Sequence, residues 1–368
     1  MNKAVVALLG RCSDLPAGTD AVDAYSALLG EALTRQGYPT TLVRVPWDER
    51  GWPRALRRLW QQSRDWDGRW VLLQYMALEW SRRGLPLAFF AVLYVLRRRG
   101  ARLGIVFHDP QGHAGQRLRD RVRRAWQHGV MRAAYRLVDL SIHTIPVDRV
   151  PWLPINPHKA VSIPVGPNIP AFDDMPHDTA RPERQRGDRT IAVFCLRAGE
   201  RKEAEEISDI AYVAQRIAER VPRLRLVVLG RSAENTRDRL QAALAATNVD
   251  LSVTGVLPAE ELSRSFIAAD ALLFVRGAIS GARGSAIAAI ACGLPVVAYA
   301  GPQTGHPITE AGVVLVPLGD RDDLAAELIR LLTDDALWSA AHQRNLAAYH
   351  RYFSWDAIAA RFVAAFSA

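Results

Sequence analysis

The chain has 368 residues, of which 49% are hydrophobic and 23% charged; this excludes a disordered protein and gives room for two domains with separate cores. Three widely spaced cysteines exclude a disulfide framework, and the longest apolar stretch, residues 85–96, is shorter than the roughly 20 residues that cross a bilayer. The net charge of +9 is uneven, because residues 1–168 hold 25 Lys and Arg against 13 Asp and Glu, whereas residues 169–368 hold 22 against 25.

The basic first half indicates an anionic partner. An anionic lipid, an acceptor that carries a pyrophosphate and a nucleic acid all have the required charge, and a solvated arginine-rich surface explains the same composition without a partner. A nucleic acid is not expected, because the chain lacks the aromatic platforms and motifs of common nucleic-acid-binding modules.

Strand and helix patterns alternate along this first half. Short apolar runs predict strands at residues 4–9, 41–45, 70–74, 101–107, 138–143 and 160–163, and periodic apolar positions predict helices at residues 21–36, 86–99 and 117–136. The opening order of strand, long helix, Gly37 and strand is typical of a βαβ unit. Residues 1–170 therefore predict one α/β domain.

Two features of this domain are candidates for function. The strand at 101–107 delivers His108 to the sheet edge at which open α/β sheets bind ligands, although a histidine there can also be purely structural. The helix at 117–136 carries a basic stripe beside an apolar one, which suits a membrane surface or a phosphate and equally suits a solvated helix face. The predicted membrane or acceptor face consists of Arg97, Arg98, Arg99, Arg117, Arg121, Arg124 and Arg132.

A polar, proline-bearing linker at residues 171–188 leads to a second α/β pattern at residues 189–345. Strands are predicted at 190–196, 224–230, 251–255, 271–275, 296–299 and 313–316. Helices are predicted at 258–268, 285–292 and 321–332 and after Trp355, and a helix after Lys202 has one buried face made by Ile207, Ile210, Ala214 and Ile217. Arg197 and Lys202 follow the first of these strands. Two cations on such a loop stabilise a pyrophosphate leaving group, with Arg201 able to replace either, although solvated loop charges are the alternative.

The most informative stretch is residues 274–300, FVRGAISGARGSAIAAIACGLPVVAYA. It predicts a strand end, a glycine-punctuated loop, a short helix ended by Gly293 and a second strand. Such a loop directs free N–H groups and the positive end of a helix dipole toward one point, which favours an anion, and Arg276 and Arg283 flank it. An ordinary tight turn fits the same spacing.

The residues Ala-Ile-Ala-Cys-Gly-Leu-Pro-Val-Val-Ala at 289–298 resemble the nucleotide-sugar loop of glycosyltransferase family 4, which has the GT-B fold of two Rossmann-like domains facing across a cleft. The resemblance covers residues 190–362 well and the first domain loosely. It differs at the two family glutamates, which are Ser280 and Ala288 here, and at the second loop glycine, which comes one place late as Gly284. The resemblance implies that residues 346–368 form a helix returning to the first domain.

The resemblance also implies the site residues. Arg197 and Lys202 would clamp the donor diphosphate, and His108 would lie beside the donor sugar, so these three are the catalytic candidates. No metal or other cofactor is expected. The donor-binding candidates are Gly18, Arg201, Val253, Gly255, Val256, Ser280, Gly281, Arg283, Gly284, Ser285, Ala286 and Ala288.

The predicted function is metal-independent, retaining transfer of a sugar from a nucleotide-diphosphate sugar to a hydroxyl of a carbohydrate or lipid-linked acceptor. The diphosphate itself would take the proton, so that no carboxylate pair is needed. The expected location is the cytoplasm, at the inner face of the membrane. Because both family glutamates are replaced, a catalytically silent glycosyltransferase-like subunit or a sugar-nucleotide-binding protein is the alternative.

Overall fold

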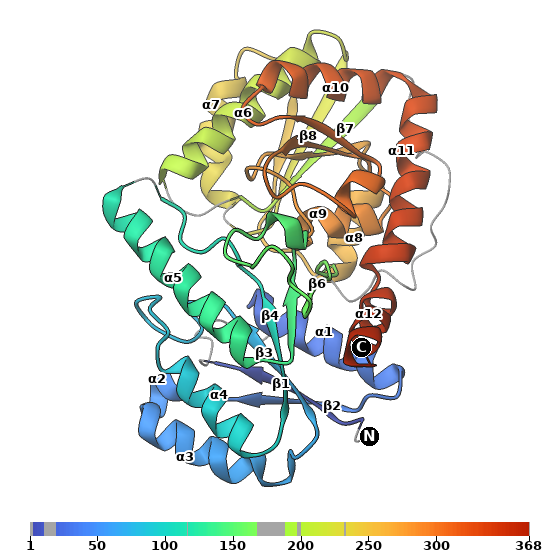
Figure 1. Ribbon diagram of the computed structural model, residues 1–368. Coiled ribbons are helices and arrows are strands. Elements are labelled where there is room, and N and C mark those ends of the chain that lie inside the picture. The colour runs from blue at the N-terminus through green and yellow to red at the C-terminus, as the bar shows by residue number, and fades with distance from the viewer. Residues whose placement is uncertain are drawn as a thin grey trace. The chain divides into compact units, whose positions relative to one another are not determined.

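The computed structural model describes residues 3–10, 20–115, 117–167, 188–196, 200–231 and 233–367. The chain divides into two compact units (Figure 1). Unit 1 comprises Met1–Val165 and Trp355–Ala368, and unit 2 comprises Gly166–Ser354. The returning segment was predicted to begin at residue 346, whereas the second stretch of unit 1 begins at Trp355.

Unit 1 is built on a six-stranded parallel sheet in the order β2-β1-β3-β4-β5-β6. Its strands are β1 (Val5–Leu9), β2 (Thr40–Arg44), β3 (Trp70–Tyr75), β4 (Arg102–Phe107), β5 (Leu140–His143) and β6 (Ala160–Ser162). All residues of β1 and β3 are buried, as expected for continuous apolar strands in a sheet that helices cover on both faces.

The helices of unit 1 are α1 (Ala21–Arg35), α2 (Trp47–Arg50), α3 (Trp52–Gln62), α4 (Phe89–Arg98), α5 (Leu118–Leu137) and α12 (Trp355–Ser367). Figure 1 shows α1 and α12 on one side of the sheet and α3, α4 and α5 on the other. The last helix is anchored on α1, because Asp356 pairs with Arg35 at 2.8 Å and the Trp355 ring meets the Tyr25 ring at 5.4 Å.

Unit 2 repeats the architecture with a parallel sheet in the order β12-β11-β10-β7-β8-β9. Its strands are β7 (Asp188–Phe194), β8 (Arg223–Leu229), β9 (Asp250–Val253), β10 (Ala271–Phe274), β11 (Val296–Ala300) and β12 (Val313–Pro317). Its helices are α6 (Glu200–Ala218), α7 (Arg237–Leu244), α8 (Ala259–Ile267), α9 (Gly284–Ala291), α10 (Arg321–Thr333) and α11 (Asp335–Ala348). One continuous core joins the sheet to α6, α7, α10 and α11.

The predicted fold class is confirmed, since both halves are α/β units with parallel sheets and every predicted strand has a counterpart. Helices α2, α3, α7 and α11 were not predicted. None of the helices in the described part of the chain combines the length and apolar character that a membrane crossing needs.

Candidate functional site

The carboxyl edge of the unit 2 sheet gathers cationic side chains. Strands β10, β7 and β8 are neighbours, and the segments after them carry Arg276, Cys195 and Arg231, respectively. Cys195 adopts a left-handed backbone conformation, with φ of 56°, and donates its N–H to Leu229 O at 2.8 Å. Burial raises the pKa of its thiol, and the charges of Arg276 and Arg231 oppose that rise. The positive charges of both guanidinium groups therefore reach the Cys195 thiol, which follows β7.

The loop from β10 to α9 is held in place by its own hydrogen bonds. The Ile279 N–H donates to Tyr299 O at 2.8 Å, and the Thr304 hydroxyl donates to Ile279 O at 2.6 Å. Ser280 is fully buried, and its Oγ accepts the Ala282 N–H at 3.4 Å. The side chain at this family-glutamate position therefore packs inside the loop.

The loop also directs Arg276 toward the start of α9. One guanidinium nitrogen of Arg276 donates to Ser285 Oγ at 3.4 Å. Its Nε is buried and finds no hydrogen-bond partner among the described residues. Helix α9 begins at Gly284 without a side-chain cap on its first N–H groups. A cation and uncapped N–H groups on one loop are what an anionic ligand requires.

The remainder of α9 is buried within unit 2. Ala286 and Ala288 have almost no exposed surface, so they pack the helix and present no side chain to a ligand. The turn after α9 is supported by α11, because the His342 ring donates from Nδ1 to Gly293 O at 2.8 Å. Burial lowers the pKa of His342, which favours the neutral ring.

The other predicted donor contacts lie on neighbouring segments. Arg201 and Lys202 are exposed on the first turn of α6, the helix that follows β7, and Arg201 pairs with Glu205 at 3.2 Å. Gly255 O accepts the Gly230 N–H at 3.0 Å, and a side chain at Gly255 would collide with the Glu234 carboxylate. Val253 is buried, Gly281 is buried, Arg283 is half-buried and Val256 is exposed. Gly18 and Arg197 lie outside the described residues.

In unit 1, His108 follows β4 at the carboxyl edge of the sheet. Its Nε2 lies 2.7 Å from Gln74 Oε1, so Nε2 carries the proton and Nδ1 carries the lone pair. Burial lowers the pKa of His108 to about 4, although the carboxylate of Asp20 opposes this. The ring contacts Tyr25 edge-on at 4.8 Å. His108 is therefore a neutral, oriented hydrogen-bond acceptor at pH 7.

Four arginines of the predicted membrane or acceptor face are bound within unit 1. Arg97 pairs with Asp139 at 3.2 Å, and Arg99 lies 3.7 Å above the centre of the Trp60 ring. Two more donate to backbone carbonyls, Arg124 to His113 O at 3.0 Å and Arg132 to Trp152 O at 2.8 Å. Arg98, Arg117 and Arg121 are exposed. Asp139 offsets the charge of Arg97, whereas the other three arginines keep their charge and are held in place by contacts within unit 1.

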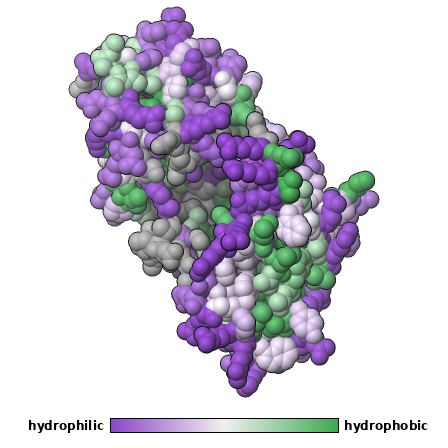
Figure 2. Space-filling view, turned by 90° about the vertical axis from the view of Figure 1, so that its left-hand side faces the viewer, coloured by the Kyte–Doolittle hydropathy of each residue, from purple (hydrophilic) through white to green (hydrophobic). Residues whose placement is uncertain are grey.

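Sequence reasoning missed an exposed apolar surface beside these arginines. Helices α4 and α5 lie side by side, since Arg97 near the end of α4 donates to Leu137 O at the end of α5 at 2.8 Å. Figure 2 shows an apolar patch bordered by hydrophilic residues on the face of unit 1 that carries these helices. Its exposed large side chains, called the α4–α5 patch below, are Leu85, Leu87, Tyr94, Leu118, Val122 and Trp126.

Comparison with known proteins supplies the family context. A family model described as "Glycosyl transferases group 1" matches residues 190–334, and a search of curated protein sequences finds no match. Three solved structures illustrate the fold, each covering at least 97% of both chains. The first is HepE of Anabaena in complex with UDP and glucose, at 13% identity over 99% of both chains with a TM-score of 0.62. The second is sucrose-phosphate synthase from Thermosynechococcus elongatus, at 17% identity over 99% of this chain and 98% of that chain with a TM-score of 0.65. The third is a glycosyltransferase from Rickettsia africae ESF-5, at 11% identity over 99% of this chain and 97% of that chain with a TM-score of 0.66.

At identities this low the likeness shows only that the fold is shared. The family model adds a match in sequence over most of unit 2. The matched range begins in β7 and contains the β10–α9 loop with Arg276 and Ser285. Residues 190–334 therefore match the family model of glycosyl transferases group 1, within a chain that has the GT-B fold.

Proposed function

We propose that the protein transfers a sugar from a nucleotide-diphosphate sugar to an acceptor hydroxyl. The observation that carries this proposal is the β10–α9 loop, where the Arg276 guanidinium and the uncapped start of α9 meet inside the range that the family model matches. The HepE structure, which shares the fold, contains UDP and glucose. That likeness supports a nucleotide diphosphate as the ligand, and the cation and N–H groups of the loop make it the proposed place for the diphosphate.

The proposed mechanism is retaining and uses protein cations in place of a metal ion. As the bond between the sugar C1 and the diphosphate oxygen breaks, negative charge grows on the diphosphate, and Lys202, Arg276 and the N–H groups of α9 stabilise it. The acceptor hydroxyl then attacks C1 from the same face and passes its proton to the departing diphosphate. Within the described ranges, no group of three or more His, Cys, Asp or Glu side chains is placed to hold a metal ion.

His108 is proposed to orient a sugar or acceptor hydroxyl. Its Nε2 proton is directed to Gln74, so Nδ1 is left to accept a hydrogen bond from a hydroxyl group. Because its pKa is lowered to about 4, the ring keeps this acceptor throughout the neutral range. His108 would therefore position the hydroxyl group, and the departing diphosphate would accept the proton.

A lipid-linked acceptor at an anionic membrane is the proposed second substrate. The α4–α5 patch exposes 64% of Tyr94 and 62% of Val122, and exposed arginines such as Arg98 and Arg121 lie on the same two helices. Apolar side chains within a basic border match the chemistry of a bilayer interface, where apolar groups enter the acyl boundary and arginines meet phosphate.

The second candidate function is a catalytically silent subunit that binds a nucleotide sugar. The observation in its favour is the packing at the two family-glutamate positions: Ser280 is fully buried, Ala288 is almost so, and neither is a carboxylate. Such a protein would keep the diphosphate site and lack turnover.

Nucleoside diphosphate binding tests the diphosphate site. Calorimetry with UDP, GDP and ADP should show binding of at least one, and Lys202→Ala, Arg276→Gln and Arg197→Ala should each weaken it roughly tenfold, since a charge-assisted hydrogen bond is typically about 1.5–3 kcal/mol. Arg216→Ala is the control, because Arg216 is an exposed cation at the other end of α6 that pairs with Glu219. Equal affinity in all variants would mean that the phosphates bind elsewhere.

A further inference from the structure

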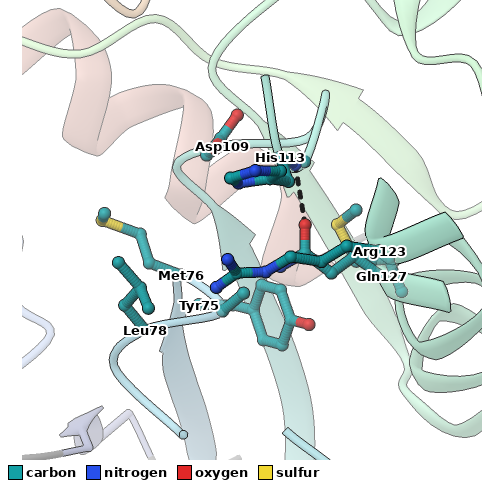
Figure 3. Close-up of a pocket in the computed structure, with 10 residues that line it drawn as sticks. Tyr75, Met76, Leu78, Asp109, His113, Arg123 and Gln127 are labelled. Carbon is teal, nitrogen blue, oxygen red and sulfur yellow. Dashed lines mark hydrogen bonds between the residues drawn. The ribbon is translucent and has the colours of Figure 1, made fainter. Parts of the chain in front are cut away.

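Unit 1 contains a cavity of about 90 Å³ that the donor site does not use. It lies where the segments after β3 and β4 meet α5, and Tyr75, Leu78, Asp109, His113, Arg123 and Gln127 contribute to its lining (Figure 3). A cavity of this size holds several water molecules, and hence has room for one phosphate group.

Hydrogen bonds hold the lining of the cavity in place. Gln127 is only 3% exposed; its Nε2 donates to Gly84 O at 2.8 Å, and its Oε1 accepts the His113 N–H at 2.7 Å. One amide thereby ties two loops to α5. Gly84 has a φ of +67° and approaches so closely that a Cβ there would lie 2.5 Å from an Arg123 nitrogen. The loops are therefore held against the arginine.

Arg123 provides the unsatisfied donor. Its Nη2 donates to Arg83 O at 2.7 Å, whereas its Nε is buried and finds no hydrogen-bond partner in the described part of the chain. Figure 3 shows the guanidinium reaching into the middle of the group, between His113 and Tyr75. The guanidinium also lines the cavity and brings its charge there, so the cavity favours a ligand that carries an anionic acceptor.

Two carboxylates lie near the cavity. That of Asp120 lies 3.3 Å from the His113 ring. Asp109 also lines the cavity, and in Figure 3 its carboxylate points away from Arg123. The guanidinium of Arg123 is thus the charge directed inward.

The surface beside the cavity is apolar. Leu78, which lines the cavity, is 48% exposed, and Leu85 follows Gly84 directly. On α5, Val122 and Trp126 precede Arg123 and Gln127 by one residue each, so they form the neighbouring stripe of the same helix and belong to the α4–α5 patch. A ligand with its anion on Arg123 would therefore lay an apolar body over these side chains.

We propose that this cavity binds the phosphate group of an amphiphile. Arg123 pairs with the phosphate, and the apolar chain packs on the adjoining α4–α5 patch. The inference rests on the proposed function, because such an amphiphile would be the lipid-linked acceptor. It adds the chemical class of that acceptor and the residue that recognises it.

Calorimetry with octyl phosphate, below its critical micelle concentration, tests the proposal. Octyl phosphate should bind to the full-length protein, whereas octyl glucoside, which has the same chain without the charge, should bind at least tenfold more weakly. Inorganic phosphate should also bind at least tenfold more weakly. Equal affinity for inorganic phosphate would overturn the amphiphile in favour of a free anion, and equal affinity for octyl glucoside would overturn the phosphate.

Two variants locate the site. Arg123→Gln should weaken octyl phosphate binding at least tenfold, and Arg123→Lys, which keeps the charge, should restore part of the loss. Arg136→Gln is the matched control, since Arg136 is an exposed arginine on the same helix and the substitution removes the same charge. An equal loss in Arg123→Gln and Arg136→Gln would show attraction by net charge alone and would contradict the pocket.

Nucleoside diphosphate binding separates failure of this inference from failure of the proposed function. Arg123→Gln should leave UDP, GDP and ADP affinities unchanged, because the proposed diphosphate site belongs to unit 2. If the wild-type protein binds a nucleoside diphosphate and no octyl phosphate, only the amphiphile pocket is wrong. If it binds octyl phosphate and no nucleoside diphosphate, the glycosyltransferase proposal fails and the pocket stands.

Discussion

Two histidines in unit 1, the buried His143 and the partly buried His108, are neutral for the same physical reason. His143, at the end of β5, bonds through Nε2 to Ser141 Oγ at 2.8 Å and stacks on Phe107 at 5.2 Å. Burial lowers its pKa to about 3 and that of His108 to about 4. An unfolded histidine has a pKa of about 6.5, so between pH 6.5 and about 4 the unfolded chain binds more protons than the folded one. The free energy of unfolding must therefore fall as the pH is lowered through this window.

His143→Gln tests that linkage. Urea unfolding of the wild-type protein should show stability that is constant above pH 7 and declines between pH 6.5 and 4.5. The variant should be less stable at pH 7, because it loses the ring stacking, and its decline should be shallower, because one titrating group is gone. Parallel pH profiles for the two proteins would show that His143 is not responsible.

The arginines show what sequence cannot reveal about single residues. Periodicity correctly placed Arg124 and Arg132 on one helix, α5. Their partners are carbonyl groups of His113 and Trp152, which reach the helix only through tertiary folding. The sequence therefore predicted a free basic stripe, whereas the structure tethers these two of its arginines. It also held no signal for the Nε of Arg123, which lacks a hydrogen-bond partner among the described residues.

At the level of elements, α11 supports the turn that follows α9. Asn345 is fully buried; its Oδ1 accepts the Gly312 N–H at 2.7 Å, and its Nδ2 donates to Leu294 O at 2.7 Å. Gly312 is also in close contact with the helix, since a Cβ there would lie 1.8 Å from Ala341 O. The Asn345 side chain thereby ties the segments that contain Leu294 and Gly312 to α11.

Asn345→Ala should destabilise the protein by roughly 2 kcal/mol or more, because it leaves a buried N–H and a buried carbonyl without their partners. Gln343→Ala, an exposed neighbour on the same helix, should change the free energy of unfolding by less than about 0.5 kcal/mol. Urea denaturation monitored by circular dichroism measures both. Similar midpoints for the two variants would remove the proposed role of Asn345.

The same helix explains why part of the fold escaped prediction. Central parallel strands such as β1 and β3 are covered on both faces and are continuous apolar runs, which made them predictable from sequence. On α11 the buried face includes His342 and Asn345 beside Trp338 and Ala341, so polar residues interrupt the apolar periodicity. The β10–α9 loop was predictable because its glycines and the following helix are local features; the burial of Ser280 was not, because it depends on packing.

At the level of the whole molecule, the proposed membrane association depends on the α4–α5 patch. Flotation with anionic liposomes should recover the wild-type protein, with less recovery on neutral liposomes, since each basic residue near an anionic surface contributes about 1 kcal/mol. The double substitution Val122→Ser and Trp126→Ser should reduce recovery strongly. Leu318→Ser, at an exposed leucine of unit 2, is the control. Equal recovery of both variants would count against the patch.

Donor turnover decides whether the protein uses a nucleotide-diphosphate sugar. The purified protein is incubated with a panel of UDP-, GDP- and ADP-sugars, and the nucleoside diphosphate released is measured with and without a lipid phosphate acceptor. We expect release from at least one donor, stimulation by the acceptor and a loss of at least tenfold in Lys202→Ala and Arg276→Gln. Binding of a donor without release would support the silent subunit, and neither binding nor release with any donor would refute the proposed glycosyl transfer.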